Sequence, residues 1–465
     1  MKTLISLFLT IILTTATFAQ NLEEQEQPLR SPFQVTLFCP PFSTNGAQNV
    51  DYVNDVSLNL FIGISGGTEM MELGGFINID RFNVNGVQLA GFGNTVGGSA
   101  HGVQIAGFYN VNGGNTDVVQ IAGFANTVGG SVTGFQAAGF INVAGGPVTG
   151  LQGAGFMNVA GNGVTGLQGA GFMNMAGNNT VGLQGAGFMN ITGRNSTVVQ
   201  GSGFANIAGG TSYGIQGAGF GNFSGEGNIN LQGAGFINLA DRVTGGQGAG
   251  FMNIAREVRG IQGSGFMNIA GYVRGVQATG FINICDSIDG VPIGFISIVK
   301  HGGYRRLEVN ASELMYAAVS WKMGVKRLYN IFTIGKPFGP ANSWLYGWGL
   351  GSEFDLSNRV VMNVEAVSHQ EMILSFPWNN WMISMNELNM YNQMRMLFGW
   401  NVAPKVAVFA GPTFNVAVAS TAAAGEPLSP TDYAPSWSFY NHTYTNPYNT
   451  NVRMWFGVHA GLRFF

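Results

Sequence analysis

Charged residues are scarce in this chain of 465 residues. Lysine, arginine, aspartate and glutamate together make up 9% of it, against about 25% in a typical globular domain. The net charge is −3, and because this balance lacks a basic excess we expect no nucleic-acid partner. Between Phe82 and Ala240 the only charged residues are Asp117, Arg194 and Glu226. This scarcity indicates that one face of the segment packs against something apolar.

Cysteine is nearly absent as well. Cys39 and Cys285 are the two cysteines, and two isolated cysteines give neither a disulfide framework nor a metal-ligand spacing, so their pairing stays open. Glycine is abundant, with 72 residues, but no Gly-x-x-x-x-Gly-Lys-Ser/Thr phosphate loop occurs. We therefore expect no cofactor, no metal and no enzymatic activity.

The N-terminus has the pattern of a secretory signal peptide. Lys2 supplies the positive charge, Leu4 to Thr14 is an apolar run, and Thr17-Phe18-Ala19 is an acceptable cleavage site. The run is too short for a membrane-spanning helix. The pattern predicts export, with residues 1–19 removed.

A short phrase, roughly Gln-x-Ala-Gly-Phe-x-Asn, repeats from residue 75 to residue 283. The step is 16 residues from Gly75 to Gly235 and then shortens to 15. A fixed short period predicts an array of stacked, equivalent units, here residues 73–299. Within one unit, Leu151 to Ala160 alternates with a period of two and Gly161 to Gly163 is turn material, which predicts β-strands.

The most regular positions predict ladders of identical side chains. Equivalent residues on parallel strands lie about 4.8 Å apart, so glutamine and asparagine amides can hydrogen-bond along the stack. Gln104, Gln120, Gln136 and Gln152 are expected ladder residues. The phenylalanines share the same alternating face, and we expect them to form the buried core of the array; they are Phe92, Phe108, Phe124, Phe140, Phe156, Phe172, Phe188, Phe204, Phe220 and Phe236.

Two architectures fit this period. In a β-solenoid each 16-residue unit is one coil, and all units point the same way. In a membrane barrel each unit is one strand of about ten residues plus a turn, and neighbours are antiparallel. The repeat shows no two-unit alternation of loops, which favours the solenoid, while one large β-barrel formed by the whole chain remains the alternative.

Residues 300–465 have a different texture, typical of an antiparallel outer-membrane β-barrel. Met454 to Phe464 alternates apolar residues with a polar set, and the chain ends at Phe465. We expect about seven strands after residue 305. Two strand-like runs in residues 20–72, namely 33–38 and 56–64, are expected to complete a barrel of eight to ten strands.

The polar face of these strands carries the few titratable side chains of the C-terminal segment. Glu365, His369, His459 and Arg463 are expected to face the lumen and to satisfy one another. Residues 421–451 look like an external loop. Its aromatic residues are candidates for contact with a surface glycan or a protein partner, with packing on the barrel mouth as the equal alternative; they are Tyr433, Trp437, Phe439, Tyr440 and Tyr444.

The repeat units, the strand at residues 56–60, the junction at 289–295 and the segment 302–306 together resemble a known family. It is the glycine-rich surface-repeat family of bacterial outer-membrane proteins, of the spirochaete and Bacteroidetes type, for which no activity is established. The chain departs from some members in lacking a lipobox cysteine.

The resemblance implies a location at the outer membrane of a Gram-negative-type bacterium, with outer-membrane lipid as a partner. We expect a structural or adhesion-like interaction role at the cell surface. The alternative is a channel or transport component whose barrel is capped by the array.

Overall fold

The structure, a computed structural model, describes residues 28–38, 42–339, 343–374, 383–384, 389–420, 433–444 and 450–465. The predicted signal peptide, Cys39 and much of the loop at 421–451 lie outside these residues. The chain divides between Ala255 and Arg256 into two compact units. Both are built from β-strands, as the sequence predicts.

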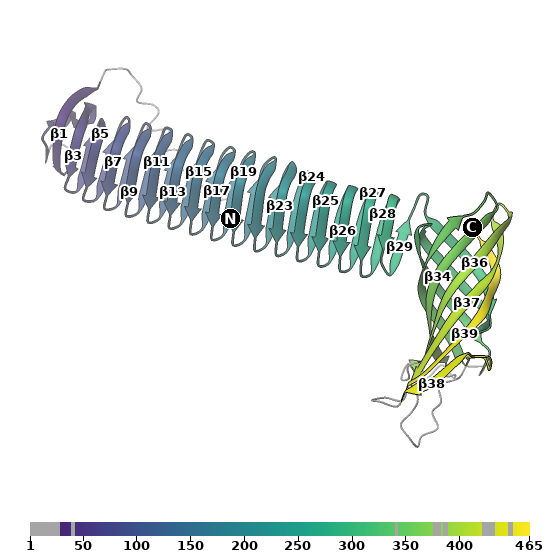
Figure 1. The fold of residues 1–465 in the computed structure, drawn as a ribbon. Coiled ribbons are helices and arrows are strands. Elements are labelled where there is room, and N and C mark those ends of the chain that lie inside the picture. The colour runs from purple at the N-terminus through teal and green to yellow at the C-terminus, as the bar shows by residue number, and fades with distance from the viewer. Residues whose placement is uncertain are drawn as a thin grey trace. The chain divides into compact units, whose positions relative to one another are not determined.

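From residue 67 to residue 218, each coil of the first unit consists of a long strand and a short strand (Figure 1). In one example, β15 (Val148–Ala154) is followed by the corner Gly155–Phe156 and then by β16 (Met157–Ala160). β15 pairs in parallel with the long strands before and after it, and β16 pairs in parallel with the short ones. Residues 16 positions apart face each other, as Gln152 and Gln168 do. The array is therefore a β-solenoid, and the alternative of one large barrel is excluded.

The other coils of this type have the following strands: β5 (Gly67–Gly74) and β6 (Ile77–Asp80), β7 (Val84–Ala90) and β8 (Gly93–Val96), β9 (Ala100–Ala106) and β10 (Tyr109–Asn112), β11 (Thr116–Ala122) and β12 (Ala125–Val128), β13 (Val132–Ala138) and β14 (Ile141–Ala144), β17 (Val164–Ala170) and β18 (Met173–Ala176), β19 (Thr180–Ala186) and β20 (Met189–Thr192), β21 (Ser196–Ser202) and β22 (Ala205–Ala208), and β23 (Thr211–Ala218).

The N-terminal strands begin this solenoid; the prediction that they join the barrel is wrong. β1 (Leu29–Phe38) pairs in parallel with β3 (Tyr52–Asn59), and β3 pairs in parallel with β5. The reason is visible in their inward side chains, such as Gln34 and Asn59, which are buried amides like those of the repeat. β2 (Phe42–Ser43), the 3-10 helix η1 (Gly46–Asp51) and β4 (Ile62–Ser65) complete these coils.

The shorter 15-residue step changes the strands. Where it applies, the long strand of one coil continues the short strand before it, because the glycine-containing corner between them is one residue shorter. The merged strands of the shortened steps are β25 (Ile237–Ala249), β26 (Met252–Ser264), β27 (Met267–Thr279) and β28 (Ile282–Ile293), and the short strand β29 (Ile296–Val299) follows them. The last 16-residue coil, β24 (Gly221–Ala234), is also a single strand, with a register shift between Ser224 and Gly227 where it pairs with β25. In the described part of the chain, no helix has both the length and the apolar character needed to cross a membrane.

The rest of the second unit is an antiparallel barrel. Consecutive strands pair along its path, and the last strand pairs back onto the first, with Arg463 opposite Glu308. The closed path comprises β30 (Tyr304–Ser312), β31 (Met315–Val325), β32 (Leu328–Pro337), β33 (Ser343–Asp355), β34 (Val360–Leu374), β36 (Asn389–Ala403), β37 (Val406–Ser420) and β39 (Thr450–Phe464), with β35 (Ile383–Ser384) and β38 (Tyr440–Tyr444) attached at its side. Among the described residues these eight strands close the barrel without the N-terminal segment.

Candidate functional site

A ladder of glutamine amides runs through the interior of the solenoid. Gln152 Nε2 donates to Gln136 Oε1 at 2.7 Å, and Gln168 Nε2 donates to Gln152 Oε1 at the same distance. Gln136 donates in turn to Gln120, and Gln120 to Gln104. All of these side chains are buried. The predicted glutamine ladder is confirmed, and it satisfies amides that would otherwise be costly to bury.

A second ladder is made by the asparagines of the short strands. Asn158 Nδ2 donates to Asn174 Oδ1 at 2.9 Å and to the carbonyl oxygen of Gly169 at 2.8 Å. Asn142 Nδ2 donates to Asn158 Oδ1 at 2.9 Å. Asparagine donors therefore point toward the C-terminal coils, whereas glutamine donors point toward the N-terminal coils.

Because the glutamine donors point toward the N-terminal coils, the N-terminal end of the glutamine ladder needs an acceptor, and two carboxyl groups lie there. The donor of the last glutamine, Gln88 Nε2, lies 2.7 Å from Glu72 Oε2 and 2.6 Å from Asp80 Oδ2. Glu72 also accepts from Asn59 Nδ2 at 2.9 Å. Burial raises the pKa of Glu72 well above its usual value, and the neighbouring Asp80 raises it further; burial also raises the pKa of Asp80. Two buried carboxyl groups in contact are most stable when they share one proton.

A glutamine pair in the second unit has the complementary pattern. Gln277 Nε2 donates to Gln262 Oε1 at 2.9 Å, but among the described residues Gln277 Oε1 has no hydrogen-bond partner. The next coil places Pro292 opposite Gln277, and proline has no amide side chain to donate. The ladder ends there.

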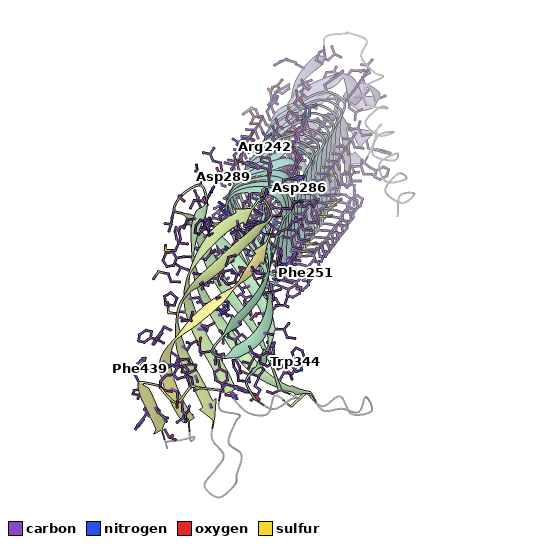
Figure 2. All side chains as sticks on the ribbon, turned by 90° about the vertical axis from the view of Figure 1, so that its right-hand side faces the viewer. Arg242, Phe251, Asp286, Asp289, Trp344 and Phe439 are labelled. Carbon is purple, nitrogen blue, oxygen red and sulfur yellow. The ribbon has the colours of Figure 1, made fainter. Side chains whose placement is uncertain are left out.

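The phenylalanines form a ladder too, but not the buried core that was predicted. From Phe76 to Phe251 each ring stacks on the next with centroids 4.7–5.1 Å apart. Eight of these rings are 36–45% exposed, and Phe251 lies on the outside of the array (Figure 2). The predicted core positions are therefore corrected to an outer row, half-buried at Phe92, Phe124 and Phe188 and exposed at Phe108, Phe140, Phe156, Phe172, Phe204, Phe220 and Phe236. We call it the phenylalanine row.

The cause of this error is the corner at Gly155–Phe156. It places the ring outside the coil, whereas continuous alternation would place it inside with Gln152 and Asn158. Small aliphatic side chains fill the remaining interior: Val128, Val132, Ala144, Val148, Ala160, Val164 and Ala176 form one buried cluster.

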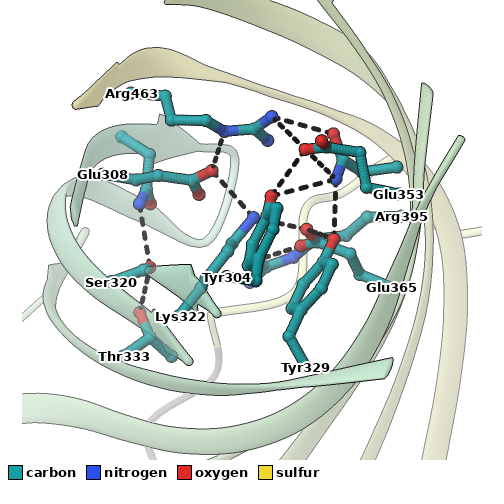
Figure 3. Close-up of polar contacts among 12 residues, drawn as sticks. Tyr304, Glu308, Ser320, Lys322, Tyr329, Thr333, Glu353, Glu365, Arg395 and Arg463 are labelled. Carbon is teal, nitrogen blue, oxygen red and sulfur yellow. Dashed lines mark hydrogen bonds and ion pairs between the residues drawn. The ribbon is translucent and has the colours of Figure 1, made fainter. Parts of the chain in front are cut away.

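Charged side chains fill the interior of the barrel (Figure 3). Lys322 Nζ lies 2.8 Å from Glu308 Oε1 and also contacts Glu365. Arg463 Nε lies 2.6 Å from the same Glu308 oxygen, and Arg395 Nη1 lies 3.7 Å from Glu365 Oε2. All five side chains are at most 2% exposed. Because each cation faces a carboxylate, the interior is close to electroneutral.

Hydrogen bonds extend this cluster across the barrel. Arg463 Nη1 lies 3.4 Å from Glu353 Oε2, which accepts from the Tyr304 hydroxyl at 2.7 Å. The Tyr329 hydroxyl donates to Glu365 Oε1 at 2.8 Å, so the network links side chains of seven strands.

The predicted lumen residues Glu365, His369, His459 and Arg463 are all buried in this interior. His369 lies between the Tyr391 carbonyl oxygen, 3.1 Å from Nδ1, and Arg395 Nη2, 3.2 Å from Nε2. Sequence reasoning missed three of their partners, Glu308, Glu353 and Arg395. The two-residue alternation along each barrel strand could have identified them, because all three stand at positions whose side chains point into the barrel.

The aromatic residues predicted to bind a ligand separate into two groups. Tyr433 is buried, and its hydroxyl donates to Glu371 Oε1 at 2.5 Å, so it is a packing residue and not an exposed one. Trp437 and Phe439 are 64% and 59% exposed. Tyr440 and Tyr444 lie on β38, with their hydroxyls 2.8 Å apart. These four are accessible, and their role as a binding site stays a prediction.

Two Gly-x-Ser-x-Gly sequences occur, around Ser65 and Ser212. Both serines are fully buried inside coils of the solenoid, and Ser65 donates to Asp80 Oδ1 at 2.5 Å. Neither is placed as an exposed nucleophile. In the described segments no group of three or more His, Cys, Asp or Glu residues is arranged to hold a metal ion.

Cys285 is a buried free thiol in β28. Burial, together with the adjacent Asp286, raises the pKa of this thiol to about 11. The open question of its pairing with Cys39 is not tested, because Cys39 lies outside the described residues.

No family model matches this chain, and neither does any curated protein or any solved structure. The resemblance to the glycine-rich surface-repeat family therefore stays a prediction.

Proposed function

We propose that this chain is a non-enzymatic outer-membrane protein in which the barrel is the membrane anchor and the solenoid is the interaction surface. The observation that carries the proposal is the reversed polarity of the barrel, with charged residues inside and large apolar side chains outside. The exposed apolar residues on its wall include Val309, Val319, Trp321, Ile334, Val364, Met394, Phe398, Val408, Phe456 and Leu462. An apolar exterior around a polar interior is the pattern of barrels that face lipid.

The filled interior favours an anchor over a channel. Barrels of eight strands have an interior just wide enough for their own side chains. Here the three cations Lys322, Arg395 and Arg463 meet the carboxylates Glu308 and Glu365 across that interior. A water-filled pathway would have to break these buried ion pairs, each of which leaves an uncompensated charge when broken.

The chemistry of the chain favours binding over catalysis. The array is dominated by amides, phenylalanine, glycine and small apolar residues, which do not titrate near neutral pH. In the barrel, Glu365 and His369 contact other groups of the same network, and no activated nucleophile stands beside them among the described residues. An enzyme needs such a group in a site that substrate can reach.

Three measurements on the full chain test the proposal. Unheated protein in detergent should migrate differently on a gel from boiled protein, because closed membrane barrels resist detergent until heated. Protease added to whole cells should remove the array while the barrel stays in the membrane fraction. In planar bilayers the protein should give no steady conductance. A chain that fractionates as soluble refutes the anchor, and a stable conductance supports the channel alternative.

A further inference from the structure

Glycines occupy three different environments in the coil formed by β15 and β16. In the example coil, Gly150 has φ +133°, and a Cβ there would lie 1.9 Å from the Gly134 carbonyl oxygen. At Gly155 a Cβ would lie 2.0 Å from the Gly139 carbonyl oxygen. The fold requires glycine at these two places, because any side chain would collide with the backbone of the preceding coil. At Gly153, by contrast, an added Cβ would meet nothing within 4 Å.

Seven successive coils share the environment of Gly153. None of the seven glycines has a positive φ, and at every one an added Cβ meets open space. We call them the glycine row: Gly153, Gly169, Gly185, Gly201, Gly217, Gly233 and Gly248. Earlier coils carry Ile105 and Ile121 at the aligned position, both partly exposed and in the same strand geometry. The fold therefore accepts a large side chain at this position, and glycine within a strand weakens it.

Apolar side chains border the glycine row. In the first six of these seven coils, an outward aliphatic residue stands two positions before the glycine, and these residues are 41–55% exposed. We call them the aliphatic row: Leu151, Leu167, Leu183, Val199, Ile215 and Leu231. On the other side lies the corner with the phenylalanine row. The aliphatic and glycine rows are roughly 7 Å apart, because strand residues rise about 3.4 Å each.

We propose that the glycine row receives the aliphatic row of a second copy of this chain. A two-fold axis parallel to the solenoid, midway between the two rows, places each copy's aliphatic row over the other's glycine row. Both copies then run in the same direction, and equivalent coils lie at the same height. The interface is self-complementary, as two-fold contacts are.

The pitch of the coils favours this partner over others. Two copies have the same spacing between coils, about 4.8 Å, so their side chains stay in register along the whole contact. A partner with any other repeat would lose register within a few coils. Like-charge repulsion is minimal, since Asp117, Arg194 and Glu226 are the only charged residues between Phe82 and Ala240.

The available area also suits a stable contact. Five exposed phenylalanines flank the glycine row: Phe156, Phe172, Phe204, Phe220 and Phe236. They are 36–40% exposed, which amounts to roughly 400 Å² of apolar surface if one side chain has about 200 Å². The aliphatic row adds to this, so that the surface comes close to the roughly 800 Å² per partner of a standard interface.

Two other occupants fit less well. A glycan stacks on the faces of aromatic rings, but each ring face in the phenylalanine row is covered by its neighbour, as between Phe156 and Phe172 at 4.9 Å. A lipid surface is usually met by tryptophan and by lysine or arginine beside the apolar residues. From Phe82 to Ala240 the sequence has no tryptophan and no lysine, and only one arginine, Arg194.

The test uses the full chain in detergent, with Gly153, Gly169 and Gly185 all changed to Val. In a single copy these changes should leave the coils intact, because the added atoms enter open space and valine favours strands. The wild-type chain should have twice the mass of one chain in light scattering at micromolar concentration, and the triple variant should have the mass of one chain. As a matched control, Met157→Val and Met173→Val on the outer side of the short strands should leave the dimer unchanged.

A second readout fixes the direction of the contact. Two differently tagged copies, one with Leu167→Cys and one with Gly169→Cys, should form a mixed disulfide on oxidation, while Leu167→Cys with Met173→Cys should not. A monomeric wild type, or a dimer that survives the valine changes without this cross-link, overturns the inference. A monomer that carries bound lipid in mass spectrometry, lost in the valine variant, overturns it in favour of an acyl chain.

The inference rests on the proposed function, since it names the partner of the same array. The two fail separately: heat-modifiable gel mobility in the same samples reports the anchor, and light scattering reports the dimer.

Discussion

Replacing Asn158 by alanine removes one rung of the asparagine ladder. The side chain is fully buried and takes part in three hydrogen bonds, to Asn142, Asn174 and the carbonyl oxygen of Gly169. Each such bond contributes about 1 kcal/mol net, and Asn174 Oδ1 also loses its donor inside the coil. We expect Asn158→Ala to lower the local stability of the surrounding coils by about 3 to 4 kcal/mol. Phe156→Ala should cost less, about 2 kcal/mol, because the ring is 36% exposed.

Hydrogen exchange followed by mass spectrometry suits this comparison, because a solenoid opens coil by coil and a single unfolding midpoint would average over all coils. A loss of about 3 kcal/mol predicts exchange roughly 100-fold faster in peptides from residues 142–174. Asn162→Ala at the exposed corner is the control and should change little, because the bonds that Asn162 Oδ1 accepts from Asn178 at 3.0 Å and from the Gly163 N–H at 2.9 Å are open to solvent. If Phe156→Ala accelerates exchange more than Asn158→Ala, the amide ladder is not the main stabilising element and the reasoning is refuted.

Three further predictions concern buried groups. The pKa of Glu72 is raised in the folded chain, so its contribution to stability is fully present below its pKa in the unfolded chain and is lost as pH rises through its folded pKa. Glu72→Gln should therefore protect the N-terminal coils from hydrogen exchange at pH 8 but not at pH 4. Equal protection at both pH values would contradict the shared proton. Lys322→Met leaves Glu308 and Glu365 without their shared cation, and we expect the barrel to lose roughly 3 to 5 kcal/mol of stability. The loss should appear as a lower temperature for the gel-mobility shift. An unchanged temperature would show that the Lys322 ion pairs do not stabilise the barrel. Because its pKa is about 11 and it is buried, Cys285 should react with a maleimide at pH 8 only after denaturation, and rapid labelling of the native chain would disprove its burial.

Much of the architecture was predictable from periodicity alone. The 16-residue step and the glutamine and asparagine positions predicted a stack with amide ladders, and the structure has both. The same alternation could not predict the outer position of Phe156. Its corner occupies two residues, so the inward phase of Gln152 resumes at Asn158 as if the strand had continued.

Other features depend on contacts that no local pattern contains. Glu308 and Arg463 are 155 residues apart, and they meet only because the last barrel strand pairs with the first. The N-terminal strands alternate as barrel strands do, and only their parallel partners identify them as coils. The glycine row was hidden for a similar reason: in the sequence Gly153 looks like Gly155, and the space above each differs only in three dimensions.

The opposite directions of the two amide ladders have an electrical consequence. A side-chain amide is a dipole, and a row of aligned dipoles adds up to partial charges at its ends, as the peptide groups of an α-helix do. In this array the glutamine dipoles run one way and the asparagine dipoles run the other, with one of each per coil. Their sum nearly cancels in every coil, so adding coils builds up no potential at the ends. A solenoid of this kind can grow long without the electrostatic penalty that would accompany a single ladder.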